Sequence, residues 1–152
     1  MKRMILIGLV LILAIVTGSA AVSEPLTYGN IVAHFKAAQL RAIQVQKRCT
    51  VFFEGEWASQ NVYSYAMIVV ENSDEDVQVT FYLTDAHEMN WVTEFLDAPF
   101  FTPTETATLF DLLHSGAEVR DRQVGRFRAD FHHWQPKHAD ILVFSFSSEK
   151  PR

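Results

Sequence analysis

The stretch that decides the fold is residues 50–84, TVFFEGEWASQNVYSYAMIVVENSDEDVQVTFYLT. It is rich in β-branched and aromatic residues, which favour β-strands, and polar clusters interrupt it twice. The interruptions predict three strands, over residues 50–57, 62–70 and 76–84. In the last of these, apolar residues alternate with mostly polar ones, as in a strand with one buried and one wetter face. Because the turns between them are short, we expect the three strands to form an antiparallel meander.

The residues before these strands predict an amphipathic helix that continues to about Lys47. Apolar side chains recur there at steps of three and four, at Tyr28, Ile31, Phe35, Ala38, Ala42, Val45 and Cys49. This spacing puts them on one face of a helix. The apolar side chains in the middle of this face are alanines, and their small size would let the helix approach a sheet or another helix closely.

Two shorter helices are predicted after the strands. Asp85 and Glu88 have the spacing of a capping box and open a helix that ends before the proline at position 99. Thr102 and Glu105 have the same spacing, with a proline between them in the first turn, and open a second helix. This second helix is expected to end at Gly116.

Two more strands, over residues 124–134 and 139–147, complete the predicted sheet and are joined by a turn at 135–138. The expected fold is α+β: a single exported domain over residues 24–152, in the order α-β-β-β-α-α-β-β. Its antiparallel sheet has about five strands, with the N-terminal helix and the two central helices packed on it. The expected core includes Phe52, Phe81, Phe127 and Phe144.

Residues 1–23 have the layout of a signal peptide. Lys2 and Arg3 precede an apolar run over residues 4–16, and small residues follow at 17–21. As a helix this run rises about 20 Å, which is shorter than the roughly 30 Å hydrocarbon core of a membrane. We therefore expect cleavage, with an uncleaved membrane anchor over residues 4–22 as the alternative. Both predict a secreted domain, periplasmic or extracellular, that meets a membrane only through this segment.

The charge balance argues against nucleic acid as a partner. The whole chain carries a formal net charge of −5. Residues 1–20 contain two basic residues and no acidic one, so their removal changes this charge to −7. A nucleic-acid surface needs the opposite sign. The single cysteine, Cys49, cannot form an intrachain disulfide and is expected to be a small buried residue.

Acidic and basic residues are separated along the chain. From Cys49 to Val119 there is no lysine or arginine, while thirteen aspartates and glutamates fall there. The basic residues lie on both sides of this stretch. Either they neighbour the acidic residues in the fold, or the acidic stretch forms a surface that attracts a basic partner. The candidate contacts of such a surface are Glu54, Glu56, Asp74, Glu75 and Asp76.

No motif predicts a catalytic residue, a metal site or a cofactor. The His87–Glu88 pair lacks the second histidine of a zinc-protease helix, because Trp91 occupies its place. His132 and His133 are adjacent on a predicted strand and so point to opposite faces, although Asp130 shares the face of His132.

The aromatic residues of the predicted strands leave two arrangements open. Trp57, Tyr63, Tyr65 and Tyr82 either form a platform on a sheet face without helices or pack beneath the helices.

The expected function is a small exported binding module, an adaptor or an inhibitor, whose acidic surface engages a basic envelope protein. One alternative is a membrane-anchored subunit of an envelope assembly. The other is a domain that binds a small ligand in a pocket between helix and sheet, or a hydrolase with weak sequence signals. The missing catalytic motifs favour a binding protein over an enzyme.

Overall fold

The computed structural model describes residues 24–58, 61–84, 89–134 and 141–149. Within them the fold is α+β, with one antiparallel sheet of seven strands and three helices. The helices are α1 (Tyr28–Ala37), α2 (Met89–Leu96) and α3 (Pro103–His114). The strands are β1 (Arg41–Val45), β2 (Cys49–Ala58), β3 (Asn61–Asn72), β4 (Asp76–Leu83), β5 (Val119–Val124), β6 (Phe127–Trp134) and β7 (Ile141–Glu149).

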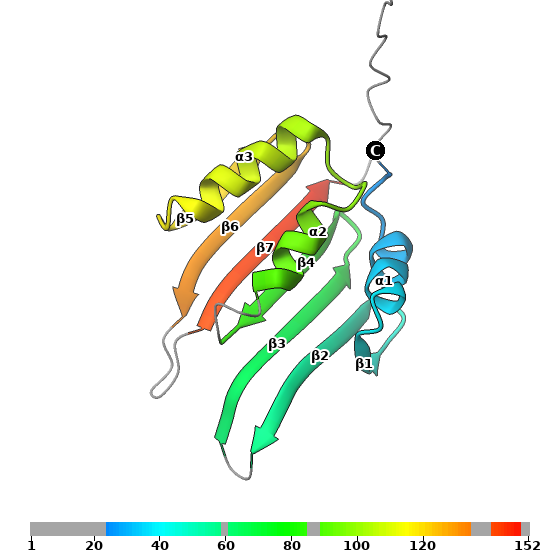
Figure 1. Cartoon of the computed structure of the whole chain (residues 1–152). Helices are drawn as coiled ribbons and strands as arrows, with labels where there is room; N and C mark the ends of the chain where they lie inside the picture. Colours follow the sequence, from blue (N-terminus) through cyan, green and yellow to red (C-terminus); the bar gives the residue numbers. More distant parts are fainter. Residues whose placement is uncertain (1–23, 59–60, 85–88, 135–140, 150–152) are drawn as a thin grey trace, which may run out of the picture.

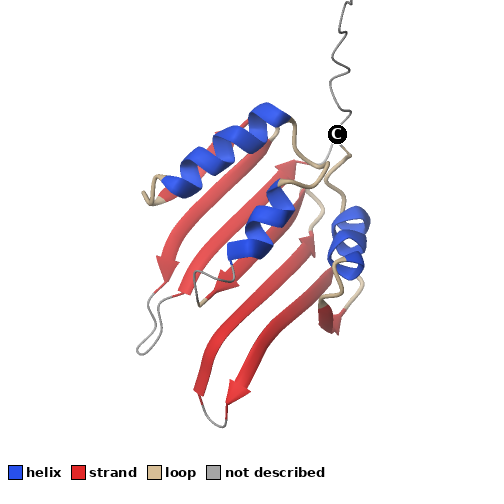
Figure 2. Cartoon of the chain, in the orientation of Figure 1, coloured by secondary structure: helices blue, strands red, loops and turns tan. Residues whose placement is uncertain are grey.

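The sheet combines two antiparallel meanders. Its strand order is β1-β2-β3-β4-β7-β6-β5, so β7 pairs with β4 on one side and with β6 on the other. The three described helices cover the same face of this sheet, and none of them lies on the opposite face (Figures 1 and 2). The predicted meander over β2, β3 and β4 is confirmed, and the prediction of about five strands is wrong by two.

The first additional strand is β1, which replaces the second half of the predicted N-terminal helix. Helix α1 ends at Ala37, and Gln39 takes a left-handed conformation with φ of 64° that turns the chain. The next residues pair with β2, where Ala42 lies opposite Phe52. The apolar spacing is compatible with a helix. However, pairing with the edge of β2 gives the backbone of these residues, which include β-branched Ile43 and Val45, strand hydrogen bonds instead.

The second additional strand is β5, which forms a hairpin with β6. The sequence predicts one strand over residues 124–134, but Gly125 takes a φ of 55° and reverses the chain there. Residues 120–123 between the buried ends of β5 are all polar and exposed. The strand therefore has no apolar alternation that could reveal it in the sequence.

Some sequence predictions fall outside the described residues. These are the signal segment at 1–23, the helix cap formed by Asp85 and Glu88, and the turn at 135–138. Helix α2 is described from Met89 onward. In the described ranges, no helix is both long enough and apolar enough to cross a membrane.

The core lies between the helices and the sheet and is dominated by phenylalanine. Phe52, Phe81 and Phe127 are buried as predicted, whereas the side chain of Phe144 lies outside the described part. Phe95 of α2 is fully buried at the centre of the cluster. Its ring lies within 5.8 Å, centroid to centroid, of the rings of Phe35, Phe81, Phe100, Phe101 and Phe146.

The predicted capping box of α3 is confirmed. The Thr102 hydroxyl accepts a hydrogen bond from the Glu105 amide, and the Glu105 carboxylate accepts one from the Thr102 amide. The same carboxylate reaches the β5–β6 turn, where it binds Arg126. Glu105 therefore joins the start of α3 to the hairpin that sequence analysis did not resolve.

Candidate functional site

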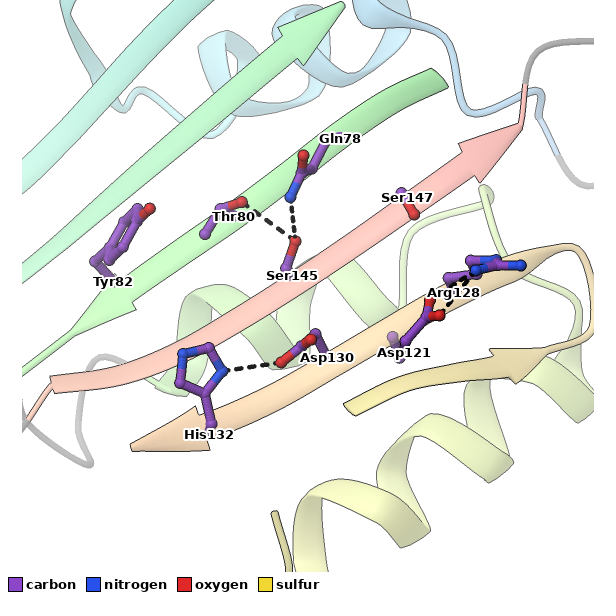
Figure 3. Close-up of a pocket in the computed structure, with 10 residues that line it drawn as sticks. Gln78, Thr80, Tyr82, Asp121, Arg128, Asp130, His132, Ser145 and Ser147 are labelled. Carbon is purple, nitrogen blue, oxygen red and sulfur yellow. Dashed lines mark hydrogen bonds and ion pairs between the residues drawn. The ribbon is translucent and has the colours of Figure 1, made fainter. Parts of the chain in front are cut away.

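The face of the sheet without helices presents the outward side chains of the strands. On β4, Val79 and Phe81 are buried beneath the helices, so the alternate residues Gln78, Thr80 and Tyr82 point to the other face. Figure 3 shows these three side chains together with residues of β7 and β6 on that face. This side of the sheet is the open face.

A shallow hollow of about 530 Å³ lies on the open face, where β4, β7 and β6 run side by side. Nearly all the residues that line it have side chains that can hydrogen-bond: Gln78, Thr80, Tyr82, Asp121, Arg128, Asp130, His132, Ser145 and Ser147, with Ala129 beside them. This composition suits a polar ligand that offers several donors and acceptors.

Hydrogen bonds connect the side chains on the β4–β7 side of the hollow. The Gln78 side-chain amide donates to the Ser145 hydroxyl over 2.7 Å, and the Thr80 hydroxyl lies 3.3 Å from the same oxygen. Neither Gln78 nor Thr80 is a base, so these contacts position the Ser145 hydroxyl without activating it as a nucleophile. This side of the hollow is therefore built to hold a ligand by hydrogen bonds.

Charged pairs line the β5–β6 side. Arg128 donates from one guanidinium nitrogen to both carboxylate oxygens of Asp121, over 2.8 and 2.9 Å. Nδ1 of His132 lies 2.9 Å from an Asp130 carboxylate oxygen, which also pairs with Arg120 over 3.4 Å. When the His132 ring is neutral and donates to Asp130, its Nε2 remains an acceptor for a ligand.

The open face becomes more apolar towards β2. The rings of Phe53 and Tyr65 stack with their centroids 5.8 Å apart, and burial raises the pKa of Tyr65. Met67 lies opposite Tyr82 in the β3–β4 register, which brings this region up to the hollow. Tyr65 and Tyr82 therefore lie on the open face. This agrees with the first of the two predicted arrangements, in which the aromatic residues form a platform on the sheet face without helices. The side chains of Trp57 and Tyr63 lie outside the described part of the chain.

The structure separates the acidic residues that sequence analysis grouped as one surface. Asp74, Glu75 and Asp76 lie together at the β3–β4 turn. Glu54 lies in β2 at the level of Leu83, because both pair with Ala66. At the rise of a β-strand, the seven steps from Asp76 to Leu83 amount to about 23 Å.

The predicted contact residues differ in their partners. Glu54 accepts a hydrogen bond from the indole nitrogen of Trp91, and Asp74 forms an ion pair with Arg48 over 2.7 Å. The Asp76 carboxylate accepts a hydrogen bond from the Ser73 hydroxyl, and the Glu75 amide donates to that hydroxyl over 3.3 Å. The side chain of Glu56 lies outside the described residues.

Among the described residues, two ion pairs join the basic flanks of the sequence to its acidic middle. Arg48 pairs with Asp74, and Arg126 pairs with Glu105 over 3.1 Å. These residues lie in oppositely charged regions of the sequence, and the fold brings them into contact as ion pairs.

Within the part of the chain that the structure describes, the histidines and the cysteine do not form a metal cluster. In the described residues, no group of three or more metal-ligating side chains comes together, and His138 lies outside them. Cys49 is half-buried, and burial raises the pKa of its thiol. A raised thiol pKa lowers the fraction of the reactive thiolate.

Sequence reasoning found one half of the hollow. It placed Asp130 and His132 on one strand face, and the structure confirms that they are neighbours. It could not add Gln78, Thr80 and Ser145, because their place beside β6 depends on the insertion of β7 between β4 and β6. The polar residues on the more solvent-exposed face of β4 were the one sequence feature that pointed to this half of the hollow.

A second cavity, of about 790 Å³, lies where the chain enters α1. Leu26, Tyr28, Val77 and Phe127 contribute much of its lining, and Arg126 borders it. Its lining is more apolar than that of the hollow on the open face. Asn72 also lines this cavity, and its side-chain oxygen is buried without a hydrogen-bond partner among the described residues.

Comparison with known proteins yields no match, whether to family models, to curated proteins or to solved structures.

Proposed function

We propose that this chain is a small exported binding module that holds a polar ligand in the hollow on the open face of its sheet. The observation that carries the proposal is the set of hydrogen-bonding side chains around this hollow, contributed by neighbouring strands of one sheet. A pleated sheet places alternate side chains at regular spacing on one face, which makes such a set rigid before a ligand arrives.

The chemistry of the lining favours a hydroxyl-rich or zwitterionic small molecule. Ser145 and Ser147 offer hydroxyls, and Arg128 and Asp121 offer both signs of charge. The side chain of Tyr82 borders the hollow and gives a ligand an apolar surface to lie against. The hollow is open to solvent, so we expect micromolar rather than nanomolar affinity.

The test is a thermal-shift screen of the purified chain with a panel of sugars, amino acids and small dicarboxylates. A ligand of the hollow should raise the melting temperature of the wild type and lose at least tenfold in affinity with Arg128→Gln. Arg122→Gln is the matched control, since Arg122 is an exposed arginine of β5 outside the lining. Equal losses in both variants would show that overall charge, not the hollow, holds the ligand.

Export is the second part of the proposal and rests on the sequence of residues 1–23 alone. Signal-peptide removal should lower the mass of the mature protein by about 2 kDa relative to the full chain. Intact-mass measurement of the protein from its native host separates this outcome from an anchored subunit, which would keep its full mass and remain in the membrane fraction.

A second candidate function is an adaptor or inhibitor that binds a basic envelope protein through carboxylates. The observation that favours it is the gathering of exposed Asp74 and Glu75 beside Asp76 at the β3–β4 turn. Glu54 and Glu56 belong to a different level of the sheet and would form a separate contact. Affinity capture from envelope extract at low and high salt tests this function, and replacement of Asp74 and Asp76 by lysine should abolish salt-sensitive capture.

A further inference from the structure

The edge strand β1 carries unusual exposed side chains. Among the described residues, the exposed large hydrophobic side chains are Ile43, at 54%, and Val45, at 66%. Both lie on β1, the terminal strand of the sheet beside β2 (Figure 1). Within the described residues, the backbone groups of β1 that point away from β2 therefore have no strand beside them. An exposed apolar strand of this kind is a template for pairing with another chain.

The other edge of the sheet is protected. Strand β5 presents polar residues at 120–123, and Asp121 takes a left-handed conformation with φ of 46° where the register shifts. Charges and a bulge are the devices by which natural proteins block pairing at sheet edges. Strand β1 also shifts register, between Ala42 and Gln44. A strand added there would pair over only a few residues.

The surroundings of β1 are basic. The sequence contains no acidic residue between Glu24 and Glu54, and its basic residues in that interval are Lys36, Arg41, Lys47 and Arg48. Arg48 pairs with Asp74, whereas the ion pairs within the described residues include neither Arg41 nor Lys47. Two exposed cations therefore flank the apolar residues of β1.

We infer that β1 accepts an extended acidic segment of another protein, which adds to the sheet as an eighth strand. Backbone hydrogen bonds to the outer edge of β1 would provide affinity, and apolar residues of the segment would cover Ile43 and Val45. Carboxylates of the segment would pair with Arg41 and Lys47. A second copy of this chain is a poorer occupant, since it would bring the same basic residues to the same edge.

The probe is an eight-residue peptide in which valine alternates with glutamate, titrated into the purified chain by fluorescence anisotropy. We expect micromolar binding that weakens as salt is raised. A peptide with lysine in place of glutamate should bind at least tenfold more weakly. A valine–glutamate peptide that is N-methylated on its backbone should also bind at least tenfold more weakly, because it cannot form the strand hydrogen bonds.

Matched variants locate the contact. Arg41→Glu should weaken binding of the acidic peptide at least tenfold, while Arg122→Glu, the same change on the opposite edge strand, should leave the dissociation constant within twofold. Replacing both Ile43 and Val45 with serine should weaken binding at least fivefold. All of these side chains are exposed, so each variant should keep the wild-type circular dichroism spectrum.

Three results would overturn the inference. The first is no binding of the acidic peptide at millimolar concentration and low salt, and the second is equal binding of the lysine or N-methylated peptide. The third is a dimer of the chain in sedimentation experiments that the double serine variant dissociates, because a second copy would then occupy the edge. None of these results bears on the hollow of the open face, which uses residues of other strands.

Discussion

At the scale of single residues, Glu105 shows how one buried carboxylate can join two elements. Its side chain is 7% exposed. It accepts hydrogen bonds from the Thr102 amide, from the Arg126 amide and from the Arg126 guanidinium. Burial alone would raise its pKa, but these hydrogen bonds and the charge of Arg126 outweigh burial and lower the pKa from 4.5 to about 2.

Replacing Glu105 with glutamine should destabilise the fold by about 2 kcal/mol at pH 7, since a buried charge-assisted network is lost. A carboxyl with a lowered native pKa stabilises the fold above its unfolded pKa. That contribution is lost as the pH falls from about 4.5 to about 2. Urea unfolding at pH 7 and pH 3 should therefore show a smaller difference between variant and wild type at the lower pH. The control is Glu118→Gln at an exposed position, for which no such difference is expected.

Gly125 is required both for its backbone conformation and for the space beside it. Its φ is 55°, and a Cβ atom there would lie 2.7 Å from Cγ of Glu105. Gly125→Ala should therefore cost about 1–3 kcal/mol in the free energy of unfolding. Gly29→Ala is the matched control, because no atom lies within 4 Å of a Cβ there and alanine favours the helix. A neutral Gly125→Ala variant in urea unfolding would contradict this account of the turn.

At the scale of elements, tertiary contacts determine the secondary structure of two segments for which the local sequence pattern predicts a different structure. The residues after Ala37 continue an apolar spacing that fits a helix, yet they form β1 because the edge of β2 is available to them. Strand β5 is the converse case. Its exposed polar residues have the pattern of a loop, and only pairing with β6 makes it a strand. In contrast, α3 could be predicted closely, because its capping box and proline act within one turn.

The described part of α2 spans eight residues, and its place on the sheet depends on its buried aromatic residue. Phe95 is fully buried and contacts the rings of five other phenylalanines. Phe95→Ala should lower the free energy of unfolding by about 3–5 kcal/mol. Glu94→Ala, an exposed neighbour on the same helix, should change it by less than about 0.5 kcal/mol. Similar denaturation midpoints for the two variants would show that α2 does not anchor the core.

At the scale of the whole molecule, β7 makes one sheet of two meanders. It pairs with β4 from the first meander along eight residues, and with β6 from the second. Without β7, the backbone groups of β4 and β6 that face it would have no strand partner. The hollow of the open face depends on the same insertion, because it brings Ser145 between Gln78 and Asp130.

The purified chain should therefore unfold in one cooperative transition. Far-ultraviolet circular dichroism, which reports the strands and helices, should give the same urea midpoint as tryptophan fluorescence, to which Trp91 of α2 contributes. Two separated transitions would instead indicate that the meanders on either side of β7 fold as independent units.

From the sequence alone follow the class of fold, the three-strand meander, the capped start of α3 and the placement of Asp130 and His132 on one strand face. These features depend on residues close together in the chain, where periodicity and capping act directly. Tertiary structure alone decided the strand order, the two added strands and the separation of Glu54 from Asp74 and Asp76. The physical reason is that strand pairing joins residues far apart in sequence, and short-range patterns carry no information about which edges meet.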